Sequence, residues 1–123
     1  MTPPFMSRDG RPMLWIMPPD GVIRPAADLP EWNRAMFHAP DAHGDIHDRH
    51  LARDRVGAFF ISTIFTGIDT ELRGPPMVFE TMVFKDDNAR QPRRQIRNPT
   101  RAEALETHAA MVKEYGAYPS SSS

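Results

Sequence analysis

The sequence of 123 residues contains no cysteine. This absence excludes disulfide bridges, thiolate zinc sites and a cysteine nucleophile, and it fits a reducing compartment. The chain also lacks a large charge of one sign, because 15 basic and 16 acidic side chains leave a formal net charge of −1. No overall field therefore draws the protein to nucleic acid or to anionic lipid, and any contact with a polyanion must be local.

Long hydrophobic runs are absent as well. No stretch approaches the length that spans a membrane, and the start of the chain, MTPPFMSRDGRP, has neither the basic cluster nor the apolar run of a signal peptide. We therefore expect a cytoplasmic protein without a membrane partner.

The 13 prolines lie mostly toward the ends and in connections. Residues 1–12 hold three prolines and one glycine without periodicity, and the chain ends in AYPSSSS. These compositions predict a flexible arm over residues 1–12 and a disordered tail over residues 117–123. Residues 13–116 are expected to form a single domain, long enough to bury roughly two thirds of its unfolded surface.

Two stretches are dense in β-branched and aromatic residues: VGAFFISTIF at 56–65 and PPMVFETMVF at 75–84. In the first, Phe60 and Ile64 point one way and Phe59 and Ile61 the other, which predicts an interior strand covered on both faces. The second is predicted to pair with it in antiparallel fashion after a wide loop. An edge hairpin is expected over residues 13–17 and 22–23, a polar loop or short polar helix over 38–55, and a short strand around 95–97.

Two capping boxes predict helices. Asp28 with Glu31 begins a helix near Trp32, and Thr100 with Glu103 begins a second helix over residues 101–115. The second helix is predicted to end with Gly116 as its C-cap. Its predicted apolar face consists of Ala102, Leu105, Ala109 and Val112.

Together these elements predict an α+β fold in which a small antiparallel sheet is packed by one or two helices, with flexible N- and C-terminal arms. The sheet is centred on residues 61–65 and 77–84. One of its faces is expected to be covered by the helix over residues 101–115 and the other by the shorter helix near Trp32.

Several motifs together resemble a family of small uncharacterised proteins common in bacteriophages and prophages. They are RDGRP near the start, EW at Glu31, STIFTGID at 62–69, PPMVFETMVF at 75–84 and the capped helix TRAEALETHAAMV. The resemblance covers most of the chain and implies a phage or prophage setting without a mechanism. Where the family has a histidine after the aspartate of G-x-D, this chain has Thr70, so no catalytic residue is carried over.

Three groups of polar residues are candidates for a site. Glu80 alternates with apolar neighbours, and Asp69 ends the neighbouring strand, so the two are candidates for a carboxylate site. The alternative is a structural glutamate paired with an arginine or with His108. His108 itself flanks the apolar stripe of the last helix, a position typical of a packing residue, and a functional role is its alternative.

The basic loop contains Arg90, Arg93, Arg94 and Arg97. These arginines are candidates for binding phosphates. Because no aromatic residues lie among them, base stacking is not favoured, and a solvated loop or a contact with an acidic protein is the alternative.

The five histidines raise the question of a metal. His43 and His47 are four residues apart with aspartates nearby, but Gly44 lies between them and weakens a helix. A solvated loop is the favoured interpretation, and no metal or cofactor is assigned.

The function that follows from these observations is a non-enzymatic phage or prophage accessory protein that binds a host or phage protein. Three alternatives stay open: a virion component, a nucleic-acid-binding module using residues 90–101, and a small enzyme using Asp69 and Glu80. The partner-binding candidates are Asp69, Glu80, Arg90, Arg93, Arg94, Arg97 and His108.

Overall fold

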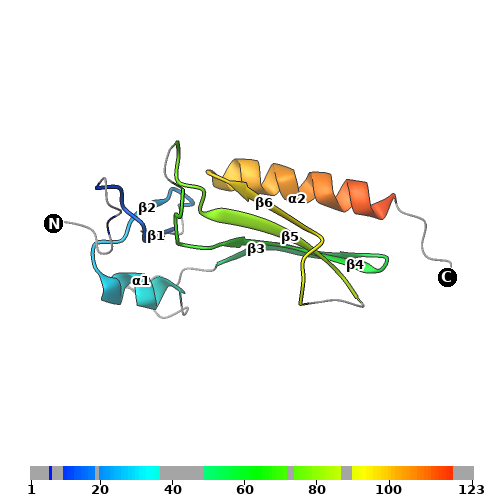
Figure 1. The fold of residues 1–123 in the computed structure, drawn as a ribbon, viewed down its shortest axis with the longest axis horizontal. Helices are drawn as coiled ribbons and strands as arrows, with labels where there is room; N and C mark the ends of the chain where they lie inside the picture. The colour runs from blue at the N-terminus through cyan, green and yellow to red at the C-terminus, as the bar shows by residue number, and fades with distance from the viewer. Residues whose placement is uncertain are drawn as a thin grey trace. The chain divides into compact units, whose positions relative to one another are not determined.

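The computed structural model describes residue 6 and residues 10–18, 20–36, 49–71, 74–86 and 90–117. Its elements in chain order are β1 (Trp15–Ile16), β2 (Arg24–Pro25), α1 (Leu29–Met36), β3 (His50–Val56), β4 (Phe59–Phe65), β5 (Phe79–Lys85), β6 (Arg94–Asn98) and α2 (Arg101–Gly116) (Figure 1). The predicted α+β class is confirmed. None of the helices in these ranges is long and apolar enough to span a membrane.

The chain divides into two compact units. Unit 1 contains residues 1–49 and 65–78, and unit 2 contains residues 50–64 and 79–123. Unit 1 therefore takes its second segment from the connection between β4 and β5. Each unit is described separately below.

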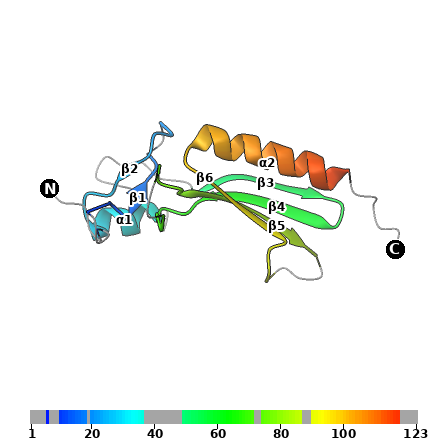
Figure 2. The ribbon, with the colours of Figure 1, turned by 45° about the horizontal axis from the view of Figure 1, so that its top comes forward.

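Unit 2 is built on a four-stranded antiparallel sheet in the order β3-β4-β5-β6 (Figure 2). The turn between β3 and β4 consists of Gly57 and Ala58, and Gly57 has a φ of +60°, a conformation that glycine adopts readily. Val56 pairs with Phe59 directly beside this turn. The interior strand predicted over residues 56–65 is interrupted by this turn, so Val56 ends β3 and the interior strand is β4, from Phe59. The predicted strands around 77–84 and 95–97 correspond to β5 and β6.

The strand β3 was not predicted. Residues 50–55 were expected in a polar loop or polar helix, but they form an edge strand paired with β4. The reason is that an edge strand tolerates charge: Arg53 and Arg55 are exposed, and such side chains discourage pairing with other chains. The rest of that prediction, over residues 38–48, lies outside the described residues.

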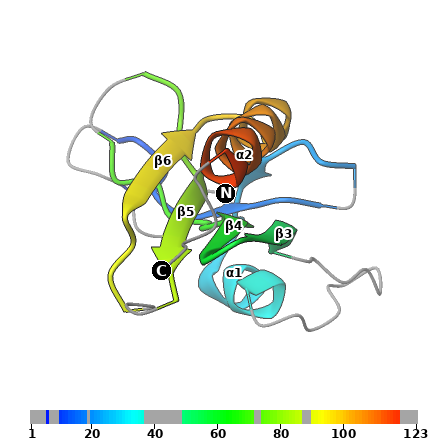
Figure 3. The ribbon, with the colours of Figure 1, turned by 90° about the vertical axis from the view of Figure 1, so that its right-hand side faces the viewer.

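Helix α2 lies along one face of this sheet and contacts β3, β5 and β6 (Figure 3). The core between them consists of Phe59, Ile61, Val83, Met111 and Tyr115, all less than a tenth exposed. The rings of Phe59 and Tyr115 are 4.8 Å apart and tilted by 59°, a favourable aromatic geometry. The predicted packing of this helix on the sheet is confirmed.

The N-terminus of α2 is capped as predicted, because the Glu103 backbone N–H donates to Thr100 Oγ1 at 3.1 Å. Two other predictions for this helix are wrong. The helix continues through Gly116, and its C-cap is Ala117 in the right-handed α conformation. The buried face also differs from the predicted one and consists of Ala104, His108, Met111 and Tyr115. His108 and Tyr115 carry polar atoms, so an apolar count alone favoured the exposed alanines instead.

Unit 1 contains a hairpin where one was predicted, but it forms a separate two-stranded sheet, and its second strand is β2 at residues 24–25 and not 22–23. Its turn is closed by a hydrogen bond from the Gly21 N–H to the Pro18 carbonyl at 2.9 Å. Helix α1 begins at the predicted cap, since the Glu31 N–H donates to Asp28 Oδ1 at 2.8 Å. The predicted end of this helix at Pro40 lies outside the described residues.

Helix α1 packs on β1, and the backbone of Gly67 is hydrogen-bonded to both elements. The Gly67 carbonyl accepts hydrogen bonds from the Trp15 backbone N–H at 2.8 Å and from Trp32 Nε1 at 2.9 Å. Gly67 has a φ of +73°, where any other residue is strained, and a Cβ there would lie 2.7 Å from Met36 Sδ and force that side chain to move. The described contacts of α1 are thus to β1 within unit 1, and its predicted place on a face of the four-stranded sheet stays a prediction.

Candidate functional site

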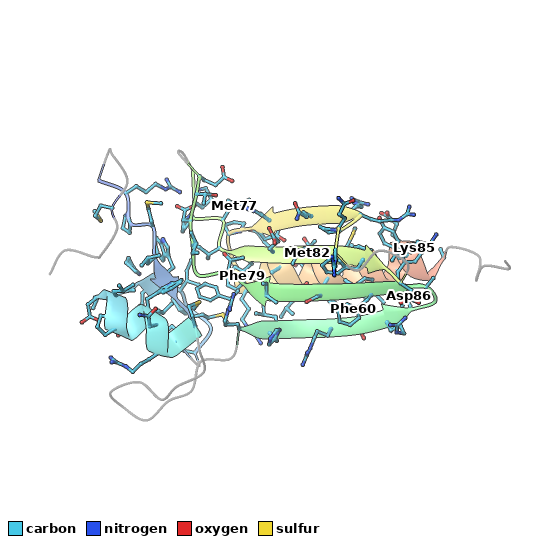
Figure 4. The ribbon with its side chains drawn as sticks, turned by 60° about the horizontal axis from the view of Figure 1, so that its bottom comes forward. Phe60, Met77, Phe79, Met82, Lys85 and Asp86 are labelled. Atoms are coloured by element: carbon cyan, nitrogen blue, oxygen red, sulfur yellow. The ribbon has the colours of Figure 1, made fainter. Side chains whose placement is uncertain are left out.

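The face of the unit 2 sheet turned away from α2 carries a stripe of half-buried apolar side chains. Phe60 and Ile64 on β4 and Met82 and Phe84 on β5 alternate with the residues that pack on α2. Figure 4 shows Phe60 and Met82 on this face, with α2 behind the sheet. We call the four side chains the apolar stripe and this side of the sheet the open face, because α2 is the only described helix of unit 2 and lies on the other side.

Arginines flank the apolar stripe on both outer strands. Arg53 pairs with Ser62 and Arg55 with Phe60 across the β3–β4 ladder, and directly paired residues point to the same face. Arg97 on β6 pairs with Glu80 in the same way. The strand residues of the open face therefore include three arginines and one glutamate, and the positive charges lie toward the sheet edges.

A hollow of about 410 Å³ lies at one end of the open face. Aromatic and charged side chains line it together: Arg55, Phe60, Phe84, Lys85 and Asp86. Arg55 donates to Asp86 at 2.6 Å, and both side chains are more than half exposed, so this ion pair contributes little to stability. The labelled Lys85 and Asp86 mark this end of β5 in Figure 4.

The predicted arginine loop is divided between the two faces of the sheet. Arg94 points toward α2 and donates to Glu114 at 2.6 Å, and this bond, with a second one to Tyr115, raises the pKa of Arg94. The Arg93 guanidinium lies 6.0 Å from the Phe59 ring centroid, and Arg90 is exposed. Of the four arginines, the strand register puts only Arg97 on the open face. They therefore do not form one phosphate-binding loop.

Asp69 and Glu80 each have an arginine partner of their own. In unit 1 the fully buried Asp69 carboxylate accepts from Arg11 Nε at 2.7 Å and from the Glu71 N–H at 3.1 Å. In unit 2 Glu80 accepts from Arg97 Nε at 3.2 Å. These pairs agree with the structural interpretation of both carboxylates, in which an arginine offsets their charge.

His108 joins a buried chain of hydrogen bonds between α2 and the sheet. Its Nε2 lies 2.7 Å from Asp54 Oδ2, its Nδ1 lies 2.8 Å from Thr63 Oγ1, and Thr63 Oγ1 lies 2.7 Å from Thr81 Oγ1. If His108 carries its proton on Nε2, it donates to Asp54, the Thr63 hydroxyl donates to Nδ1, and the Thr81 hydroxyl donates to Thr63. All four side chains are then hydrogen-bonded.

This chain has the order of an acid, a base and a hydroxyl, the arrangement that activates a nucleophile in hydrolases. Thr63, however, is 0% exposed and His108 is 5% exposed. A substrate cannot reach a hydroxyl that is closed off in this way, so we interpret the chain as a structural link. His108 is thus a packing residue with both ring nitrogens hydrogen-bonded.

Unit 1 has an apolar hollow of its own, of about 380 Å³, lined by Met6, Met13, Leu14, Leu29 and Trp32.

Also in unit 1, Glu31 accepts hydrogen bonds from Arg24 at 2.9 and 3.1 Å. This bond lowers the pKa of Glu31 more than partial burial raises it, and the Ala27 N–H contributes in the same direction as Arg24.

The candidate metal ligands His43 and His47 lie outside the described residues. His50 begins β3 and is exposed. Among the residues that the structure describes, no three histidine, aspartate or glutamate side chains are grouped as a metal site requires. The metal question therefore depends on residues 37–48.

Comparison of the chain with protein-family models, with curated proteins and with solved structures finds no significant match. Sequence reasoning missed the open face, although the alternation of Phe60 with Ile64 and of Met82 with Phe84 carried the signal. The flanking Arg53 and Arg55 were hidden in a stretch that was expected to be a loop.

Proposed function

We propose that this chain is a non-enzymatic phage or prophage accessory protein that binds a protein of the host or of the phage through the open face of unit 2. The observation that carries the proposal is the apolar stripe with arginines on both sides. Clustered apolar side chains within a polar rim are typical of protein–protein contacts. The phage setting depends on the sequence resemblance alone.

Two features weigh against the enzyme alternative. In the described residues, the one hydroxyl–histidine–carboxylate chain ends in the buried Thr63. Asp69 and Glu80, the candidate catalytic carboxylates, are each paired with an arginine. Neither arrangement offers a reactive group to a substrate.

Affinity capture from lysates of an infected and an uninfected bacterial host tests the proposal. The wild type, a Phe60→Ser/Met82→Ser variant and a Val22→Ser control are compared. Val22 is 67% exposed in unit 1, so its replacement removes apolar surface elsewhere. We expect the wild type and the control to retain the same partner and the open-face variant to lose it. Equal capture by all three, or no capture by the wild type, contradicts the proposal.

A second candidate function is binding of single-stranded nucleic acid. Phe60 and Phe84 line one hollow together with Lys85 and the Arg55–Asp86 ion pair, so stacking surface lies beside cationic groups, as in proteins that bind single strands. Sequence analysis did not identify this combination, because the residues come from three separate strands. A mobility-shift assay with short single-stranded oligonucleotides across a salt series tests it, with a steep salt dependence as the expected sign.

A further inference from the structure

We propose that the partner segment seated on the open face is an amphipathic α-helix with acidic residues on the side of its apolar stripe that lies over β3. This inference rests on the proposed function and adds the chemistry of the partner. Three properties of the open face carry it: its width, its charge distribution and the way in which α2 already occupies the opposite face.

The width of the apolar stripe fits one helix. Neighbouring strands lie about 4.8 Å apart, and a helix with its side chains is roughly 10 Å across, so one helix covers β4 and β5 together. Its two flanks then lie over β3 and β6. Phe60 and Ile64 are four residues apart, about 13 Å along a strand, which corresponds to roughly nine residues of helix.

The charges lie where such a helix would present its flanks. Arg53 and Arg55 are on β3, at one side of the stripe, and Arg97 is on β6, at the other. Arg53 is exposed and has no carboxylate partner among the residues that the structure describes. Arg97, in contrast, is paired with Glu80. Aspartate or glutamate on the flank of the partner over β3 therefore complements this face, whereas lysine or arginine there opposes it.

The same charges argue against two other occupants. A second copy docking face to face through a two-fold axis brings arginine-flanked surfaces together, which like charges oppose. A nucleic acid strand uses the hollow at Phe60 and Phe84 but gains no stacking from Ile64 or Met82, which continue the stripe. An apolar helix face contacts all four side chains.

Helix α2 shows how this sheet holds a helix. Met111 and Tyr115 pack on the sheet core, and Glu114 at the flank of the helix accepts from Arg94 of the edge strand β6 at 2.6 Å. Helix α2 thus binds the sheet through apolar residues and places an acidic residue against an arginine of β6. On the open face the exposed Arg53 of the edge strand β3 can make the same kind of contact, while Arg55 is paired with Asp86 and Arg97 with Glu80.

The test uses two synthetic amphipathic peptides of roughly 18 residues, long enough to be helical in water when rich in alanine. Both carry the same leucine stripe, and one has glutamate and the other lysine on its flanks. Binding of each labelled peptide to the full chain is measured by fluorescence anisotropy at low and at physiological salt. We expect the acidic peptide to bind at least about tenfold more tightly than the basic one, with the difference reduced by salt.

Charge reversal assigns the site. Arg53→Glu is expected to weaken the acidic peptide several-fold and to strengthen the basic one. Arg101→Glu, which changes the charge equally at an exposed position on α2, is the matched control and should change neither. Because both substituted positions are exposed, loss of folding does not confuse the comparison.

Equal affinity for the two peptides, or an acidic peptide indifferent to Arg53→Glu, overturns the inference. So does self-association in sedimentation that Phe60→Ser abolishes, which assigns the face to a second copy. Oligonucleotide binding that Arg53→Glu abolishes, without peptide binding, assigns it to nucleic acid. If the peptides fail while Phe60→Ser/Met82→Ser still loses its captured partner, the helix inference fails and the proposed function stands.

Discussion

Replacement of His108 by alanine should be the most damaging change to the buried hydrogen-bond chain. The imidazole is 5% exposed, and its removal leaves a cavity that costs roughly 1–2 kcal/mol. The lost bond to Thr63 costs about 1 kcal/mol. The lost bond to Asp54 costs about 1 kcal/mol, a value discounted because that carboxylate is 53% exposed and water replaces the imidazole.

We therefore expect His108→Ala to reduce the free energy of unfolding by about 3–4 kcal/mol, which lowers Tm by roughly 10–15 °C for a chain of this size. Denaturant unfolding monitored by circular dichroism measures it. Asp54→Asn, which removes the charge at the exposed end, should cost less than about 1 kcal/mol.

The threonines provide the sharper comparison. Thr63→Val keeps the shape of the side chain but leaves Nδ1 of His108 and the Thr81 hydroxyl without their partner, so it should cost about 1–3 kcal/mol. Adding Thr81→Val removes the orphaned Thr81 hydroxyl and should cost little more, or restore some stability. Additive costs of the two valine substitutions, or an Asp54→Asn variant as unstable as His108→Ala, would refute the assignment of this chain as one connected network.

Three further predictions concern the carboxylates. Asp69→Asn should destabilise the protein by roughly 2–3 kcal/mol in denaturant unfolding, because it removes the fully buried carboxylate charge that Arg11 Nε contacts at 2.7 Å; a neutral result contradicts the buried ion pair. Glu80→Gln should change stability by only about 1 kcal/mol and leave partner capture intact, and a folded variant that loses all activity favours the enzyme alternative. The lowered pKa of Glu31 stabilises the fold above its ordinary value of 4.5, and this contribution is lost as the pH falls through the folded-state pKa below that value. The stability difference between wild type and Glu31→Gln should thus be constant from about pH 7 to pH 5 and shrink below about pH 4.5; a gap that persists at low pH contradicts the assignment.

The local features of this fold could be predicted from the sequence. Asp28 and Thr100 cap helices because their side chains reach backbone N–H groups three residues away, an interaction that short sequence motifs contain in full. The two apolar strands were equally evident, since burial alone explains their composition. Element class therefore followed from residues that are close in the chain.

The strand β3 could not be recognised in this way, because its stability comes from distant residues. Its polar side chains have no amphipathic pattern, and they become a strand by pairing with β4 and by the contact of Asp54 with His108, 54 positions further on. The buried face of α2 was missed for the same reason, since His108 is acceptable in the core only when Thr63 and Asp54 satisfy its nitrogens.

The candidate site shows the same division. The sequence predicted that an arginine or His108 would pair with Glu80. That the partner is Arg97 depends on the β5–β6 register. The open face combines β3, β4, β5 and β6, so no single stretch of sequence contains it. Its composition became visible only when the strand order was known.

Because both tryptophans lie in one unit, tryptophan fluorescence and circular dichroism report on different units of this protein. Trp15 and Trp32 are the only tryptophans of the chain, and both belong to unit 1, where they donate to the carbonyl of Gly67. The longer helix, α2, belongs to unit 2 and dominates the helical circular dichroism signal. Tryptophan emission therefore follows the melting of one unit and ellipticity mainly that of the other. Coincident transitions would identify a single cooperative fold, and separated transitions would give each unit a stability of its own.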